Sequence, residues 1–154
     1  MQILRQFALA SLLVLAACGK PAPSACAGEG ISASNAWVRA AAEGGVSAGF
    51  VTLCNGGDGA DRLVAARFDG AETVELHMTA MGDDGVARMT PIEGGLALPA
   101  GEETALAPGG AHIMLIGLTA PIEAGDEAAI TLEFERAGPQ TVTFEARSRV
   151  NAAH

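Results

Sequence analysis

Basic residues are scarce in this chain of 154 residues. It has a single lysine among nine basic residues, against 18 acidic ones, and its formal net charge is −9. Binding to nucleic-acid phosphates requires a basic face, and so few cations cannot supply one. With 49% hydrophobic and 18% charged residues, the composition also excludes a disordered chain. We therefore expect one folded domain that does not bind nucleic acid.

Long apolar runs are missing after the N-terminus. The longest apolar stretch covers residues 7–17, contains one serine and follows Arg5. It is too short to span a bilayer but is typical of the hydrophobic region of a signal peptide. No later segment approaches 18 apolar residues, so we expect no other membrane-spanning segment.

The end of this stretch carries a processing signal. Small residues precede Cys18, as in the bacterial lipobox, where the cysteine becomes the lipidated first residue of the mature protein. We expect a lipoprotein signal peptide at 1–17 and a periplasmic protein anchored to a membrane through Cys18. Gly19 is not the aspartate that marks inner-membrane retention in some bacteria, which favours the outer membrane. The alternative is an ordinary signal peptide with a coincidental cysteine.

Cysteine is rare, with Cys18, Cys26 and Cys54 only. With Cys18 assigned to lipid, an even pair in an exported protein indicates a disulfide. It would close a loop of about 28 residues and stabilise the fold by roughly 3 kcal/mol. Two free thiols, or Cys54 as a small buried apolar residue, are the alternatives. A reactive cysteine is not supported, because there is no C-x-x-C pair and no histidine near either residue.

No helical pattern is present, while 20 glycines and seven prolines indicate many turns. Residues 18–30 are typical of a flexible tether, and residues 31–150 would form the domain. Short runs of β-forming residues alternate there with turn signals. The expected strands are 31–41, 46–54, 62–69, 72–81, 86–90, 112–118, 128–136 and 140–150. Seven to nine short strands at regular spacing predict an all-β fold, a β-sandwich or Greek-key barrel.

Methionine and histidine are concentrated in one window. Four of the five methionines and two of the three histidines lie there: His77, Met78, Met81, Met89, His112 and Met114. Residues i and i+2 of a strand share a face, so His112 and Met114 project to one side. His77 and Met81 also share a face, whereas Met78 points away unless a bulge intervenes.

The face of Met89 depends on the turn before it. A three-residue loop at 83–85, with Gly85 left-handed, would pair Thr79 with Met89 and place Met89 on the face of His77. A two-residue loop at 84–85 would turn Met89 to the other face. Any metal site that uses both residues therefore requires the longer loop.

Imidazoles and thioethers together suit a soft metal ion. They select Cu(I) over Zn(II), Mg(II) or Ca(II), and the thioether needs no deprotonation. A blue-copper electron carrier would need a cysteine ligand, and the window contains none. Taken singly, each methionine is more often a core residue and each histidine an ordinary polar residue. An all-neutral set could release Cu(I) by stepwise ligand exchange, which suits carriage more than catalysis.

The spacing of these residues resembles that of a known family. The order along the chain is His77-Met78, ten residues, Met89, 22 residues and then His112-x-Met114. This resembles the H-(M)-x10-M-x21-H-x-M pattern of the PCuAC-type periplasmic copper chaperones, which are associated with assembly of the CuA centre of cytochrome c oxidase. The second gap is one residue longer and lies in a loop-rich stretch, 90–111. The likeness extends over residues 31–148, and residues 108–114 are its most specific segment.

The resemblance implies a cupredoxin-like β-sandwich that binds one Cu(I) near its surface. It implies the ligands His77, Met89, His112 and Met114, with Met78 as the bracketed, additional position. The implied partner is the CuA domain of cytochrome c oxidase subunit II or another copper chaperone, outside the cytoplasmic membrane.

Two other functions stay open. A copper-buffering or resistance lipoprotein would share the site but lack a specific acceptor. A metal-free structural β-sandwich lipoprotein predicts instead that the four ligands do not converge. An enzyme is the least supported class, because the sequence shows no nucleophile–base set, no distinctively spaced carboxylate pair and no phosphate loop.

Overall fold

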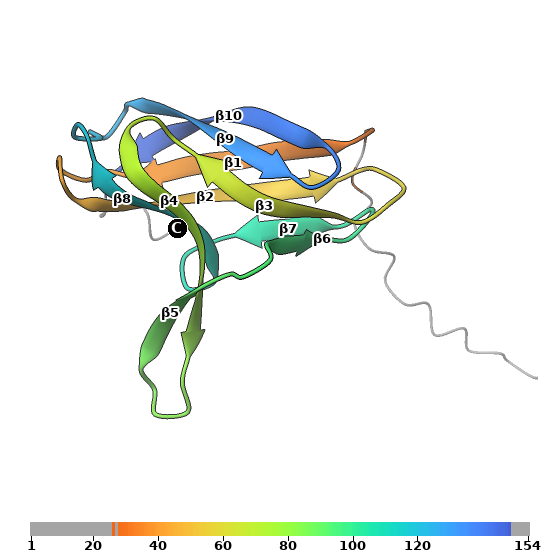
Figure 1. Ribbon diagram of the computed structural model, residues 1–154, viewed down its shortest axis with the longest axis horizontal. Coiled ribbons are helices and arrows are strands. Elements are labelled where there is room, and N and C mark those ends of the chain that lie inside the picture. The colour runs from red at the N-terminus through yellow and green to blue at the C-terminus, as the bar shows by residue number, and fades with distance from the viewer. Residues whose placement is uncertain (1–25, 27, 149–154) are drawn as a thin grey trace, which may run out of the picture.

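The computed structural model describes residues 26 and 28–148, and all its regular elements there are strands (Figure 1). They are β1 (Ile31–Arg39), β2 (Val46–Asn55), β3 (Asp61–Arg67), β4 (Ala71–Met81), β5 (Ala87–Pro91), β6 (Leu96–Leu98), β7 (Glu103–Leu106), β8 (Ala111–Leu118), β9 (Glu127–Phe134) and β10 (Gly138–Arg147). No helix in this part is long and apolar enough to cross a membrane. The expected signal peptide at 1–17 and the expected lipidation at Cys18 lie outside the described residues.

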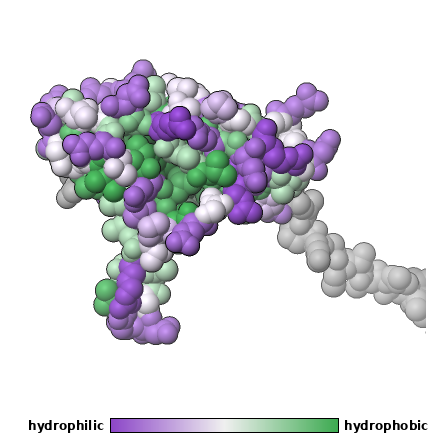
Figure 2. Space-filling view, viewed as in Figure 1, coloured by the Kyte–Doolittle hydropathy of each residue, from purple (hydrophilic) through white to green (hydrophobic). Residues whose placement is uncertain are grey.

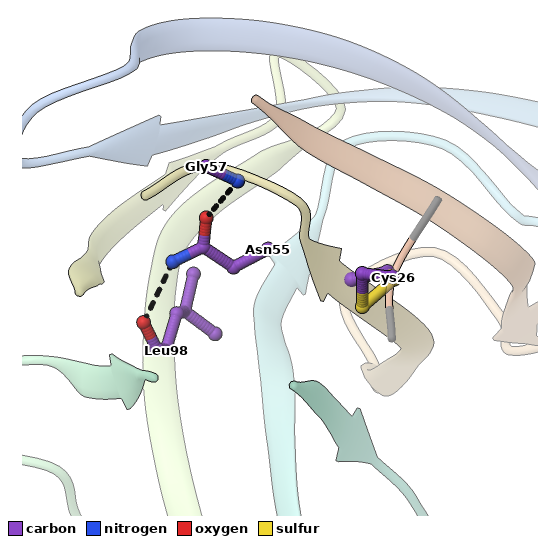
Figure 3. The surroundings of a disulfide bond; sticks show 5 residues. Cys26, Asn55, Gly57 and Leu98 are labelled. Atoms are coloured by element: carbon purple, nitrogen blue, oxygen red, sulfur yellow. Dashed lines mark hydrogen bonds between the residues drawn. A yellow bond between two sulfur atoms is a disulfide. The ribbon is translucent and has the colours of Figure 1, made fainter. Parts of the chain in front are cut away.

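The strands form a sheet in the order β5-β4-β8-β2-β1-β10-β9-β3-β6, with β7 beside β2. β1 runs parallel to β10, and the other pairings are antiparallel. On one side, β2 pairs with two strands: its first half pairs with β8 and its second half with β7. At its end, Asn55 Nδ2 donates a hydrogen bond of 2.9 Å to the carbonyl of Leu98 in β6, the far end of the order (Figure 3). The sheet thus curls back on itself around an apolar interior, as the expected β-sandwich requires.

Alternating residues of the strands fill this interior. β9 shows the pattern most clearly, with Ala128, Ile130, Leu132 and Phe134 buried and the residues between them more exposed. The largest fully buried side chains are Phe144, Leu53, Leu63, Leu98, Ile113, Leu115, Leu118, Ile130, Leu132, Val38 and Val51. Because side chains alternate along a strand, the neighbours of Ile113 and Leu115 in β8 face the other way. The outer face of β8 therefore carries His112 and Met114.

The β4–β5 hairpin projects from the body of the domain (Figure 1). Its turn is the three-residue loop, because the Gly82 N–H donates to the Val86 carbonyl at 2.9 Å and Gly85 is left-handed, with φ of 74°. Thr79 consequently pairs with Met89. Of the two expected turns, the one that places Met89 on the face of His77 is present.

A disulfide joins Cys26 to Cys54 in β2, with 5.6 Å between their Cα atoms (Figure 3). The chain after Cys26 is also held to the domain, since the Gly56 N–H donates to the Gly30 carbonyl at 2.8 Å. The last residues of the tether expected at 18–30 are therefore part of the folded domain.

All eight expected strands are present, with ends shifted by up to three residues. Two further short strands, β6 and β7, lie within residues 90–111, which the sequence indicated to be loop. They have three and four residues, too few to show an alternating pattern. They pair with β3 and β2.

Candidate metal centre

Three neighbouring strands bring the expected ligands to one outer face of the sheet. His77 of β4 lies directly opposite His112 of β8, and their ring centres are 6.0 Å apart. A metal–nitrogen bond of about 2 Å places an ion roughly 3 Å from the centre of an imidazole ring. A separation of 6.0 Å therefore lets both rings reach one ion between them.

A hollow of about 230 Å³ opens on this face, and its lining includes Met89, His112 and Met114. Met89 belongs to the projecting hairpin and is 60% exposed, whereas His112 is 6% exposed. Met114 pairs with Glu75 on one side and with Ala48 of β2 on the other. His77 is not part of the lining but is buried beside His112. The site thus combines two buried imidazoles with an exposed thioether.

The two histidine rings are held through different nitrogen atoms. His112 Nδ1 donates to the Gly110 carbonyl at 3.0 Å, which leaves the lone pair of Nε2 free. His77 Nε2 donates to Glu75 Oε2 at 2.7 Å, which leaves the lone pair of its Nδ1 free. This Nδ1 is the one buried side-chain nitrogen or oxygen without a hydrogen-bond partner among the described residues. Because buried polar atoms are normally satisfied, the orphaned nitrogen fits a metal ligand.

The two remaining methionines of the window lie outside this arrangement. Met78 is partly buried and packs against the hydrophobic core, on the opposite side of β4 from His77. Strand alternation thus turns the bracketed position of the family pattern toward the core, away from the other candidate ligands. Met81 shares the face of His77 but lies nearer the turn and is 70% exposed.

The donors define which ion this site would suit. In the described part of the chain, no group of three or more histidine, cysteine, aspartate or glutamate side chains could hold a metal ion. The convergent set consists of two imidazoles and two thioethers, all of them neutral and half of them soft. Such a set favours Cu(I) over harder ions.

An aromatic pair adjoins the hollow. Phe50 of β2 lies with its ring centre 4.4 Å from Trp37 and 6.3 Å from His112. Both aromatic residues are buried, yet neither is part of the main hydrophobic core. They pack on the outer face of the sheet and support the His112 ring from the side away from His77.

Sequence reasoning missed Phe50 and Glu75 as members of the site. Glu75 precedes His77 by two residues and shares its face, so strand periodicity could have identified it. Phe50 had no such signal, because its place depends on the pairing of β2 with β8.

Comparison with solved structures defines the class of this domain. The copper-bound PCuAC domain from PmoF2 is 26% identical, with a TM-score of 0.63 over 77% of this chain and 92% of that chain. CuI-DR1885 from Deinococcus radiodurans is 28% identical, with a TM-score of 0.52 over 77% and 78%. Apo-DR1885, at 22% identity and a TM-score of 0.56 over 97% and 99%, supports the fold alone. The domain has the cupredoxin-like fold of the PCuAC class, as the sequence predicted.

The family itself follows from sequence. Residues 31–146 match the family model described as "Putative lipoprotein LpqE-like", and the chain belongs to this family. The relative named "Putative lipoprotein Lxx21020", from Leifsonia xyli subsp. xyli, is 42% identical over 106 residues, or 69% of this chain. The matched part spans 63% of that relative's length.

Proposed function

We propose that this protein is an extracytoplasmic copper chaperone that carries one Cu(I) as cargo. His77, Met89, His112 and Met114 hold the ion. The observation that carries the proposal is the strand register, which sets His77 against His112 and brings Met89 and Met114 to the hollow that His112 lines. The copper-bound state of the similar PCuAC domain from PmoF2 supports the choice of metal.

The arrangement explains how such a site releases its cargo. The four ligands are neutral, so bound Cu(I) keeps its single positive charge and no proton has to move on release. The histidines are buried and fixed by hydrogen bonds, whereas Met89 is exposed on a projecting hairpin. An incoming ligand therefore replaces the Met89 thioether first, and the two imidazoles dissociate from the ion last.

The destination and the anchor are part of the same proposal. The acceptor is the CuA domain of cytochrome c oxidase subunit II, reached directly or through another copper chaperone. A lipid on Cys18 holds the protein at a membrane, with the outer membrane favoured by Gly19. The relative from Leifsonia xyli, which is named "Putative lipoprotein Lxx21020", supports the anchor.

An anaerobic Cu(I) titration of residues 19–154 against a chromophoric Cu(I) chelator tests the site. We expect one tight equivalent, lost in the His112→Ala, Met114→Ala double variant. The matched control is Met78→Leu, which changes a methionine on the core face and should keep the copper. Absence of binding below micromolar concentrations would reject the chaperone and favour a structural lipoprotein.

A second measurement separates carriage from buffering. The Cu(I)-loaded protein is mixed with the apo CuA domain, and the copper content of each is followed after separation. Transfer faster than spontaneous release into buffer indicates delivery. Transfer no faster than release would indicate a copper-buffering lipoprotein that has the same copper site but no specific acceptor.

A further inference from the structure

Arg39 lines the same hollow as Met89, His112 and Met114, and its guanidinium has no acidic partner. All 18 aspartates and glutamates of the chain lie in the described part, and none forms an ion pair or hydrogen bond with Arg39. The other five arginines described there each contact an acidic side chain or a backbone oxygen: Arg62, Arg67, Arg88, Arg136 and Arg147. Of the six arginines in the described part, the one without a partner thus lies beside the candidate metal ligands.

The surroundings of Arg39 make its lack of a partner costly. It is half-buried, and its guanidinium carbon lies 5.8 Å from the centre of the Phe50 ring. Its register partner on β10 is another cation, Arg147, which stacks 5.6 Å from the Trp37 ring. Arg147 is compensated by Glu145, whose Oε2 lies 3.2 Å from Arg147 Nη2. Arg39 is therefore the cation at this place that calls for a partner outside the chain.

We propose that Arg39 makes the hollow a binding point for a carboxylate side chain of the protein that receives the copper. The hollow is far larger than a metal ion needs, and its lining beside Arg39 includes the apolar Val46, Ala48 and Pro108. A guanidinium matches a carboxylate through two parallel hydrogen bonds. The positive charges that the hollow offers a ligand are the Arg39 guanidinium and a monovalent copper ion. They suit a singly charged carboxylate better than a phosphate, which carries more charge.

This inference rests on the proposed function for its dependence on copper. The empty hollow holds the uncompensated charge of Arg39. The loaded hollow adds the charge of Cu(I), which the Glu75 carboxylate beside His77 offsets in part. A carboxylate therefore binds the loaded protein about threefold more tightly than the empty one. The acceptor can in this way distinguish a chaperone that carries copper from one that does not.

The test uses the full chain, purified in detergent, with two short peptides that differ only in a central glutamate or glutamine. Trp37 is the single tryptophan, so its fluorescence reports binding at the neighbouring arginines. Inorganic phosphate at equal ionic strength is the competing probe. Arg39→Gln removes the charge and Arg39→Lys keeps it. Arg67→Gln, an arginine of β3 paired with Glu133, is the matched control.

We expect the glutamate peptide to bind the copper-free chain about tenfold more tightly than the glutamine peptide, and the loaded chain to show a larger preference. In the copper-free chain the preference should vanish in Arg39→Gln, persist weakly in Arg39→Lys and stay unchanged in Arg67→Gln. Equal binding of the two peptides to the copper-free chain, or a preference there that survives Arg39→Gln with unchanged melting temperature, would overturn the inference. Stronger binding of phosphate than of the glutamate peptide would overturn the choice of a carboxylate.

The same titration on the copper-free chain separates this inference from the proposed function. If the chain takes up no Cu(I), the chaperone proposal fails. The empty hollow should still prefer the glutamate peptide because Arg39 remains uncompensated. A lack of preference in both states would reject the role of Arg39 whatever the copper result.

Discussion

His77 and His112 face each other across β4 and β8, with ring centres 6.0 Å apart, and they are held through opposite ring nitrogens. A backbone carbonyl fixes His112 and the carboxylate of Glu75 fixes His77. The two imidazoles of the proposed site are therefore fixed on two neighbouring strands. Met89 lies on β5, whose residues are all exposed. The hairpin that β5 forms with β4 stands clear of the body of the domain (Figure 2), so under the proposed function ligand exchange begins there.

Glu75 should be needed for orienting His77. Glu75→Ala removes the acceptor for the Nε2 proton, so the ring is free to change tautomer and turn. We expect the Cu(I) affinity to fall roughly 10- to 100-fold, as for other residues that orient a ligating histidine. Glu75→Gln should lose less, because its amide oxygen can still accept the proton.

Chelator competition measures these affinities, and ¹⁵N NMR of the copper-free protein identifies the protonated nitrogen of His77. Glu72→Ala, on the opposite face of the same strand, serves as the control. An unchanged tautomer and affinity in Glu75→Ala would show that the 2.7 Å hydrogen bond has no orienting role.

Met89 should contribute to copper binding, and Met81 should not. Both are exposed on the β4–β5 hairpin, at 60% and 70%, but only Met89 lines the hollow. Met89→Leu keeps the apolar volume and removes the sulfur, so we expect affinity to fall about tenfold. Met81→Leu should leave affinity unchanged in the same chelator competition. If both substitutions lowered the Cu(I) affinity equally, lining the hollow would not distinguish Met89 from Met81 as a copper ligand.

Much of the fold could be predicted from sequence because its signals are local. Asp83, Asp84 and Gly85 indicated the turn, and strand alternation correctly separated His77 from Met78. The same alternation placed His112 and Met114 on one face. Each of these inferences needs only residues a few positions apart.

The parts that sequence did not predict depend on which strands become neighbours. Phe50 and Arg39 reach the hollow because β1, β2 and β8 lie side by side, although β8 follows β2 by more than 50 residues. β6 and β7 are too short to show a period, and backbone pairing with β3 and β2 sustains them. No local pattern contains this long-range information.

The Cys26–Cys54 disulfide should stabilise the fold without affecting the metal site. Cys54 lies near the end of β2, whereas Ala48, beside Met114, lies in its first half. Replacing both cysteines by alanine should lower the free energy of unfolding by about 3 kcal/mol. Urea unfolding measures the loss, and Cu(I) affinity is measured on the same sample. A change in affinity in the folded double variant would contradict the separation of the two regions.

Asp61 should make stability depend on pH. Burial alone would raise its pKa, but the backbone N–H groups of Arg62, Arg136 and Ala137 hold the pKa below the ordinary 3.8. A lowered pKa in the folded state stabilises the fold above the unfolded value, and this contribution is lost as the pH falls below 3.8. Asp61→Asn should therefore melt roughly 2–5 °C lower at pH 7, with the difference shrinking in acid. The exposed Asp58→Asn is the control. A constant difference between pH 7 and pH 3 in thermal melts would show that Asp61 acts through packing and not through its charge.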